Sequence, residues 1–146
     1  MTRALNGEQV AKKIIEAYPG ADAVADRAGV IVNSESLFQV AEFLKKAPEF
    51  DFNYLGDLTA VDYTDYFEVV YRLVSLEHNH SLVLKTRCYD RDNPAVPSVT
   101  KIWRAANFME REVYDLMGIV FMGHPNLKRL FLWEGFEGHP LRRDYL

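Results

Sequence analysis

Three long strand-like runs follow one another in the middle of this chain, and they limit its fold more than any other feature. They are rich in Val, Leu, Tyr and Phe, as β-strands are, and they cover residues 54–62, 67–78 and 81–89. Polar breaks between them suit tight turns. Apolar residues alternate along the second run, with one set at Phe67, Val69, Tyr71 and Leu73 and another at Val70, Val74 and Leu76. We therefore expect the second run to be a strand that is covered on both sides.

Two helices and a hairpin precede these runs. The first helix covers residues 6–18 and begins at a capping asparagine. Residues 23–28 and 30–33 are expected to form the two strands of a hairpin. Ser34 or Ser36 caps a second helix, and Ser36 makes the better capping box, together with Gln39. Because the strands come in blocks rather than in strict alternation with helices, the order indicates an α+β fold with a mixed or antiparallel sheet.

A third helix is expected to begin at Asn107. Glu110 lies three residues later and can form a capping box with it. Arg111 and Asp115 are four residues apart, so they can form an ion pair along the helix surface. Gly118 is well placed as the C-terminal cap, because a left-handed conformation is cheap only for glycine.

The segments on either side of this helix are less regular. We expect a loop over residues 90–97, a short helix capped by Ser98 that leads into the third helix, and extended chain over residues 119–121. Gly123-His124-Pro125 then breaks the chain, and Gly138-His139-Pro140 repeats that break. The sequence therefore predicts an α+β domain over residues 1–122 and an irregular C-terminal arm over residues 123–146.

Composition and charge exclude several classes of protein. With 146 residues and 49% hydrophobic content, the chain is expected to form one domain with a sizeable core. The net charge of −4, without a basic face, argues against nucleic-acid binding. The single Cys88 excludes an internal disulfide and an iron–sulfur cluster held by this chain alone. No run approaches the roughly 18 apolar residues of a membrane span, so we expect membrane association only through partners.

The residues that could carry chemistry each have a simpler structural explanation. His124 and His139 could bind a metal, but a zinc site needs three or four convergent ligands, and a His-Pro turn after glycine more often bonds a backbone carbonyl. Glu110 and Glu112 could act as acid and base, but two positions apart they point to different sides of a helix. No nucleophile elbow or phosphate loop occurs. The sequence therefore predicts no catalytic, cofactor-binding or metal site on this chain.

The arm combines large apolar residues with basic ones. The apolar set is Leu127, Leu130, Phe131, Leu132, Trp133 and Phe136, and the basic set is Lys128, Arg129, Arg142 and Arg143. These residues could fold back on the domain's own sheet, or they could dock on a partner, since aromatic and arginine residues are common interface anchors. Because the arm has two helix-breaking points and weak periodicity, we expect another surface to order it.

A long ordered string of residues carries a family resemblance. It runs through Glu110-Arg111-Glu112, Asp115-Leu116, Gly118-Ile119, Phe121, Gly123-His124-Pro125, Leu127 and Arg129, and it closes with Gly138-His139-Pro140-Leu141-Arg142 and Asp144-Tyr145. In these residues the chain resembles the thirty-kilodalton subunit of respiratory complex I, the NADH:quinone oxidoreductase, which is also called its C subunit. Phe108 stands where that family usually has Trp.

The resemblance implies a fold and a role. It implies a domain with helices on one face of the sheet and a C-terminal extension. It also implies a non-catalytic structural and assembly subunit in the peripheral arm of the complex, next to the forty-nine-kilodalton subunit and the iron–sulfur subunits. By family, the chain holds no cofactor, and the iron–sulfur clusters, FMN and quinone lie on partner subunits. In a bacterium it would lie at the cytoplasmic side of the inner membrane. The motif residues, including Arg111, Glu112, Arg142, Arg143, Asp144 and Tyr145, are expected to contact partners.

Two other classes stay open. By family, the same module occurs in energy-converting hydrogenases and in dehydrogenases fed by ferredoxin or reduced coenzyme F420, where the electron-input site lies on other chains. A stand-alone metal-dependent hydrolase that uses His124 and His139 is the more remote alternative.

Overall fold

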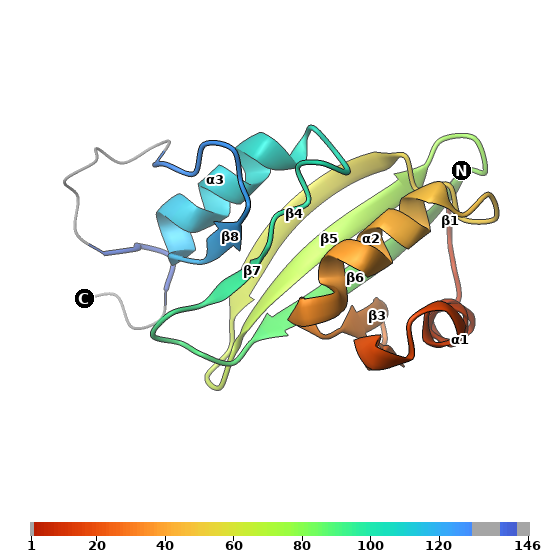
Figure 1. Ribbon diagram of the computed structural model, residues 1–146, viewed down its shortest axis with the longest axis horizontal. Helices are drawn as coiled ribbons and strands as arrows, with labels where there is room; N and C mark the ends of the chain where they lie inside the picture. The colour runs from red at the N-terminus through yellow and green to blue at the C-terminus, as the bar shows by residue number, and fades with distance from the viewer. Residues whose placement is uncertain (1, 130–137, 143–146) are drawn as a thin grey trace.

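A mixed sheet forms the body of the protein (Figure 1). The computed structural model describes residues 2–129 and 138–142. Six strands lie in the order β2-β3-β6-β5-β4, with β1 also paired to β6. They span Arg3–Ala4 (β1), Val24–Ala25 (β2), Gly29–Val32 (β3), Tyr54–Asp62 (β4), Phe67–Ser75 (β5) and His80–Cys88 (β6). β4, β5 and β6 pair antiparallel, β2 and β3 form the predicted hairpin, and β1 and β3 run parallel to β6.

Helices cover one face of this sheet, as expected for a two-layer α+β fold. They are α1 (Gly7–Ala17), α2 (Leu37–Lys46) and α3 (Ala106–Met117), with short 3-10 turns η1 (Pro19–Ala21) and η2 (Ser34–Ser36). The core lies between the layers, where Tyr71 and Leu73 of β5 are fully buried together with Ile14 of α1 and Leu44 of α2. None of the helices in the described part of the chain is long and apolar enough to cross a bilayer.

The opposite face of β5 is only partly covered. Val70 is 8% exposed, but Arg72 on the same side of the strand is exposed. Leu76 lies beyond the end of the strand and is 66% exposed. The expectation that this strand is covered on both sides is therefore right at Val70 and wrong at Leu76.

The first two helices begin in different ways. Asn6 caps α1 as predicted, since its Oδ1 accepts hydrogen bonds from the N–H groups of Glu8 (2.9 Å) and Gln9 (3.2 Å). Ser36 makes no side-chain capping bond, so the capping box expected there is wrong. Instead Asn33 Oδ1 accepts from the N–H of Ser36 at 2.9 Å, which adds the 3-10 turn η2 ahead of α2.

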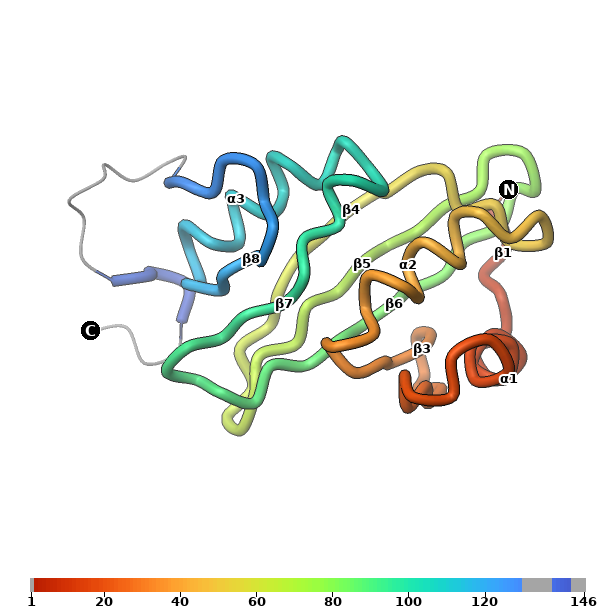
Figure 2. Tube along the Cα trace, in the orientation of Figure 1, coloured from red at the N-terminus to blue at the C-terminus, as the bar shows by residue number. Residues whose placement is uncertain are grey.

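A small second sheet fixes the position of α3. It consists of two parallel strands, β7 (Ala95–Pro97) and β8 (Val120–Met122). The extended chain predicted near β8 is confirmed, but the loop predicted over residues 90–97 is wrong where β7 forms. Pairing between strands that lie on either side of a helix leaves no local pattern in the sequence. As Figure 2 shows, α3 and β8 lie at one end of the molecule and α1 lies at the other.

The start of α3 also differs from the prediction. The helix begins at Ala106, so Asn107 lies inside it, and no side chain caps it. Residues 98–103 form a turn held by hydrogen bonds to the Val99 carbonyl rather than a helix. The predicted capping box is wrong because Glu110 is fully buried on the inner side of α3, away from Asn107.

Candidate functional site

The C-terminal end of α3 is where several of the predicted site residues meet. Gly118 ends the helix with φ +78°, in the left-handed conformation that the sequence predicts. A Cβ at this position would lie 2.7 Å from Cδ2 and 3.0 Å from Nε2 of His139. Glycine is therefore required here twice, once by the backbone conformation and once by the ring that packs against it.

Asp115 is fully buried, and the arginine that pairs with it comes from the arm. Arg129 Nε donates to Asp115 Oδ1 at 2.5 Å. Its Nη2 donates to the backbone carbonyls of Asp115 (2.8 Å) and Gly138 (2.6 Å). The predicted pair of Arg111 and Asp115 is wrong, because Asp115 faces inward and Arg111 instead donates from Nε to the Lys128 carbonyl at 3.4 Å.

The second half of the arm completes the cap of α3. His139 Nδ1 lies 3.0 Å from the Asp115 carbonyl, and the N–H of Leu141 donates to the Leu116 carbonyl at 2.9 Å. These carbonyls belong to the last turn of the helix, where no intrahelical donors remain. The positive charge of Arg129 also suits the negative end of the helix dipole. We call Asp115, Gly118, Arg129 and His139 the α3 junction.

Arg142 also returns to the domain. Its Nη2 donates to the Arg91 carbonyl at 2.7 Å, and its Cζ lies 4.9 Å from the centre of the Phe67 ring. Arg91 lies over the same ring at 4.5 Å and pairs with Asp62 at 2.6 Å. The described parts of the arm thus contact the domain itself. Leu127 lies within the described residues and is half-buried. The other arm residues that the sequence singled out lie outside the described residues: Leu130, Phe131, Leu132, Trp133, Phe136, Arg143, Asp144 and Tyr145.

Both Gly-His-Pro breaks begin with a left-handed glycine. φ is +86° at Gly123 and +88° at Gly138, values that glycine adopts without steric cost. A Cβ at Gly123 would have no neighbour within 4 Å, in contrast with Gly118. Pro125 and Pro140 follow two residues later, so the two breaks share their conformation at the glycine as well as their sequence.

The two histidines bond backbone carbonyls, as the turn interpretation predicts. His124 Nε2 lies 3.0 Å from the Asn107 carbonyl, while its Nδ1 accepts from the N–H of Asn126 at 2.9 Å. Because Nδ1 accepts, the Nε2–H is the group that donates to the Asn107 carbonyl. His139 instead lies at Asp115, about eight residues and so roughly 12 Å further along the helix. The structure therefore does not bring the two histidines together, and the described residues contain no cluster of three possible metal ligands.

Glu110 is the buried carboxylate of α3. It is fully buried, and it accepts hydrogen bonds from Ser98 Oγ (2.6 Å) and from the N–H of Val99 (2.8 Å). Burial raises its pKa from 4.5 to about 7, against the opposing effect of these two hydrogen bonds. Glu112 is only half-buried, in line with the prediction that the two glutamates point to different sides. Glu110 thus ties the 98–103 turn to α3.

Cys88 and Tyr71 are two more buried titratable groups. Burial raises the pKa of the Cys88 thiol to about 11, so this thiol stays protonated and unreactive at neutral pH. Burial, and then the charges of Glu110 and Cys88, raise the pKa of Tyr71. The Tyr71 hydroxyl has no hydrogen-bond partner among the described residues.

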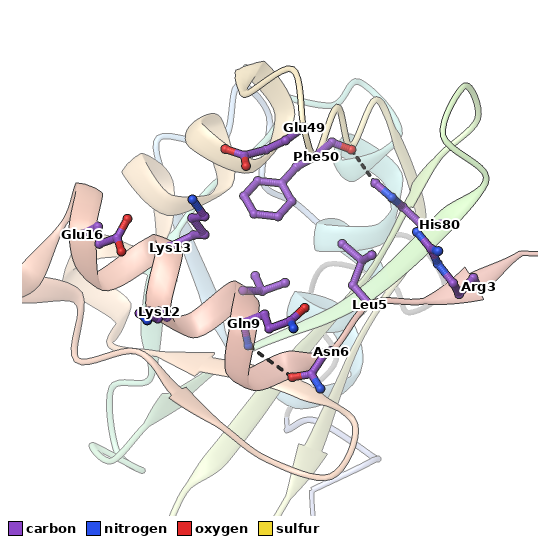
Figure 3. Close-up of a pocket in the computed structure, with 11 residues that line it drawn as sticks. Arg3, Leu5, Asn6, Gln9, Lys12, Lys13, Glu16, Glu49, Phe50 and His80 are labelled. Carbon is purple, nitrogen blue, oxygen red and sulfur yellow. Dashed lines mark hydrogen bonds between the residues drawn. The ribbon is translucent and has the colours of Figure 1, made fainter.

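Among the surface hollows of the described residues, one lies beside α1 and another at the start of α3. The first, of about 420 Å³, lies beside α1 (Figure 3). Apolar Leu5 and Phe50 and the charged Arg3, Lys13 and Glu49 are among its lining residues. The second, of about 410 Å³, lies at the start of α3 and is lined by Thr100, Lys101, Arg104, Asn107, Gly123 and Pro125. Sequence reasoning missed both hollows, because their walls come from segments that are far apart in the chain.

Known proteins match most of this chain. Residues 30–146 match a sequence model of the family described as "Respiratory-chain NADH dehydrogenase, 30 Kd subunit". The chain is 42% identical over 150 residues to the C subunit of the NADH-quinone oxidoreductase of Roseiflexus sp. (strain RS-1), and the match covers 97% of this chain and 84% of that protein. It is 46% identical over 117 residues to the C subunit numbered 2 of the Rhizobium etli enzyme, where the match covers 78% of this chain and 62% of the relative. The matched region is thus less than two thirds of the latter relative.

A solved structure and a mitochondrial protein extend these similarities. The chain superposes with a TM-score of 0.76 and 28% identity on a chain from the membrane-bound sulfane sulfur reductase, an archaeal respiratory membrane complex, and this match covers 95% of the present chain and 85% of the other. It is 42% identical over 123 residues to mitochondrial NADH dehydrogenase [ubiquinone] iron-sulfur protein 3 of Candida albicans, covering 82% of this chain and 43% of that protein.

Proposed function

The chain belongs to the respiratory-chain NADH dehydrogenase 30 kDa subunit family, and from this premise we propose that it is a structural and assembly subunit of an NADH:quinone oxidoreductase. It lies in the peripheral arm of the complex and contacts the forty-nine-kilodalton subunit and the iron–sulfur subunits. Partner subunits hold the iron–sulfur clusters, FMN and quinone, and this chain supplies no catalytic group. The observation that carries the proposal is the family match over residues 30–146.

The contacts of the reactive side chains support a structural role. Glu110 is engaged by Ser98 and the Val99 N–H, and both arm histidines face backbone carbonyls. The thiol of Cys88 is buried and protonated at neutral pH. Glu110, His124 and His139 thus each contact a neighbouring segment of the fold, and the Cys88 thiol is buried.

We place the chain at the cytoplasmic side of a bacterial inner membrane, attached through its partners. The matched archaeal structure is described as a respiratory membrane complex, which supports peripheral attachment to such an assembly.

The arm docks on a partner subunit while its described residues remain anchored to the domain. The α3 junction holds residues 129 and 138 together, since Arg129 bonds both Asp115 and the Gly138 carbonyl. Leu141 is anchored by its backbone, yet its side chain is 61% exposed. A surface that is already ordered loses less conformational entropy on binding than a free chain end. Leu141 is therefore an apolar contact that the domain presents to another subunit.

A single exposed leucine tests this docking. The tagged full chain, with Leu141→Ser, replaces the native copy, and the forty-nine-kilodalton subunit that co-purifies from membranes in mild detergent is quantified by mass spectrometry. Its recovery should fall several-fold. Leu76→Ser is the matched control, because Leu76 is 66% exposed at the far turn between β5 and β6, and it should leave recovery unchanged. Equal recovery from both variants would refute docking through the arm, and a wild-type chain that recovers no subunit of the complex would refute the assembly role.

The absence of a resident cofactor is tested on the isolated chain. We expect a colourless protein without stoichiometric iron, zinc or flavin, by elemental analysis and absorption spectroscopy. An iron–sulfur or flavin spectrum that follows the chain through purification would contradict a purely structural role.

A second candidate is the equivalent subunit of a related respiratory complex with another electron input. The TM-score of 0.76 to a chain of the archaeal sulfane sulfur reductase supports this second candidate. The complex that co-purifies should be assayed with NADH, ferredoxin, reduced coenzyme F420 and hydrogen as donors. Activity with NADH supports the first candidate, and activity with another donor alone supports the second.

A further inference from the structure

The hollow at the start of α3 is positively charged. Lys101 and Arg104 both line it, and both side chains are exposed. Neither forms an ion pair with any residue in the described part of the chain. The remaining walls come from Thr100, Asn107, Gly123 and Pro125, which carry no charge. The hollow, of about 410 Å³, thus presents two positive charges that no described residue matches.

Hydrogen bonds to buried groups fix the turn that forms one wall of the hollow. Glu110 fixes the 98–103 turn by accepting from Ser98 and from the Val99 N–H. Thr100 is fixed in turn, because its N–H donates to Ser98 Oγ at 3.2 Å. These contacts are buried or part-buried, so the turn that carries Lys101 is ordered before any partner arrives.

The other side of the hollow is fixed by the first Gly-His-Pro break. His124 lies between Gly123 and Pro125, and its ring bonds the Asn107 carbonyl at 3.0 Å. The N–H of Ser98 also donates to the Met122 carbonyl at 2.8 Å, which ties the turn to β8. In Figure 1, α3 and β8 lie side by side at this end of the molecule. Motif residues Glu110 and His124 are therefore positioning residues for the hollow.

We propose that this hollow receives an acidic side chain, Asp or Glu, from a segment of a partner subunit. The inference rests on the proposed function, because it needs a partner in the assembled complex. Lys101 and Arg104 lie on ordered walls and have no anionic partner among the residues that the structure describes, so they attract an anion, and a carboxylate relieves the repulsion between them. A protein carboxylate fits better than nucleic acid, because a nucleic acid needs a wider basic face and this chain carries a net charge of −4.

Carbodiimide cross-linking of the assembled complex tests the contact directly. This reagent joins an amine to a carboxylate only where the two already touch. The complex is purified with the wild-type chain, cross-linked and mapped by mass spectrometry. We expect Lys101 to be joined to an Asp or Glu of another subunit. Acetylation of the complex should also modify Lys101 several-fold less than it modifies Lys101 in the isolated chain. Lys101 equally reactive in both states would overturn the proposal.

Charge reversal tests whether the contact contributes to binding. Lys101→Glu with Arg104→Glu should lower the affinity for the forty-nine-kilodalton subunit or the iron–sulfur subunits roughly tenfold or more, and most strongly at low salt. Lys12→Glu with Lys13→Glu, on the exposed side of α1, is the control with the same change in charge and should bind as the wild type does. Circular dichroism and the melting temperature of both variants check folding.

The outcomes separate this inference from the proposed function. If the wild type assembles and the Lys101/Arg104 variant assembles equally well, the inference fails and the proposed function stands. If both charge-reversed variants lose affinity equally, the effect is general electrostatics and the hollow is not the site. If the wild type recovers no partner, both fail. If inorganic phosphate protects Lys101 from acetylation in the isolated chain while complex formation does not, the hollow binds free phosphate and the inference fails.

Discussion

Replacement of Gly118 by alanine separates two reasons for a glycine at the end of α3. The left-handed backbone at φ +78° destabilises a residue with a Cβ by roughly 1–2 kcal/mol. The new Cβ would also lie 2.7 Å from Cδ2 of His139, so the ring must move. Its movement breaks the contact of His139 Nδ1 with the Asp115 carbonyl, which contributes about 1 kcal/mol more. Gly118→Ala should therefore lower the free energy of unfolding by roughly 2–3 kcal/mol.

Gly123→Ala is the matched control, because it carries the backbone penalty alone. Its φ is +86°, and no atom lies within 4 Å of the added Cβ. It should lower stability by roughly 1–2 kcal/mol. The assay is urea unfolding of the full chain followed by circular dichroism, with thermal melts as a check, where each kcal/mol shifts the melting temperature by about 3–4 °C.

A double-mutant cycle with His139→Ala completes this test. Without the ring, the extra loss at Gly118 should disappear, and the two alanine variants should become equally unstable. Equal losses already in the wild-type background would refute the packing of the arm on Gly118. A Gly118→Ala variant as stable as the wild type would refute the helix end itself.

Substitutions at Glu110, Gly29 and Tyr71 probe the interior, with Gly20→Ala as an exposed control. Glu110→Gln should flatten the pH dependence of stability, because the folded pKa of about 7 lies above the ordinary 4.5. The stability that Glu110 contributes is fully present below pH 4.5 and is lost, up to roughly 3 kcal/mol, as the pH rises through about 7. If the free energy of unfolding of both proteins changes in parallel from pH 4 to 8, this reasoning is contradicted. Gly29→Ala places a Cβ 1.9 Å from the Val83 carbonyl oxygen of the paired strand, so it should cost more than about 3 kcal/mol, whereas Gly20→Ala, with no neighbour within 4 Å, should stay within about 0.5 kcal/mol of wild type. Tyr71→Phe removes a buried hydroxyl without a described partner and should leave the melting temperature unchanged or raise it; a clear fall would show that the hydroxyl is bonded.

Local patterns in the sequence determined the elements that depend on neighbouring residues. The long strands β4, β5 and β6 followed from alternating apolar residues and from turn residues between them. The Asn6 cap and the Gly118 cap could also be predicted from the sequence, because each depends on one residue within one helical turn. The bonding of His124 and His139 to carbonyls also followed from their place after a chain-breaking glycine.

Side-chain partners across the chain were decided by tertiary structure. The spacing of Arg111 and Asp115 allowed an ion pair, but burial turned Asp115 toward Arg129 of the arm. Glu110 stands at capping-box spacing from Asn107, yet it faces inward and binds the 98–103 turn. The sequence shows which residues can pair along one helix, whereas only the packed structure shows which side of that helix is buried.

The sequence by itself determined the fold class, the Asn6 and Gly118 helix caps and the family resemblance, because each rests on residue types at short, fixed spacings. Tertiary structure alone decided the parallel pairing of β7 with β8, the α3 junction and the cationic hollow of Lys101 and Arg104. Each of these joins segments that are separated by a helix or a loop. Whether such segments come into contact depends on how the whole chain packs around its core. The spacing of residues within one helix or strand does not determine that contact.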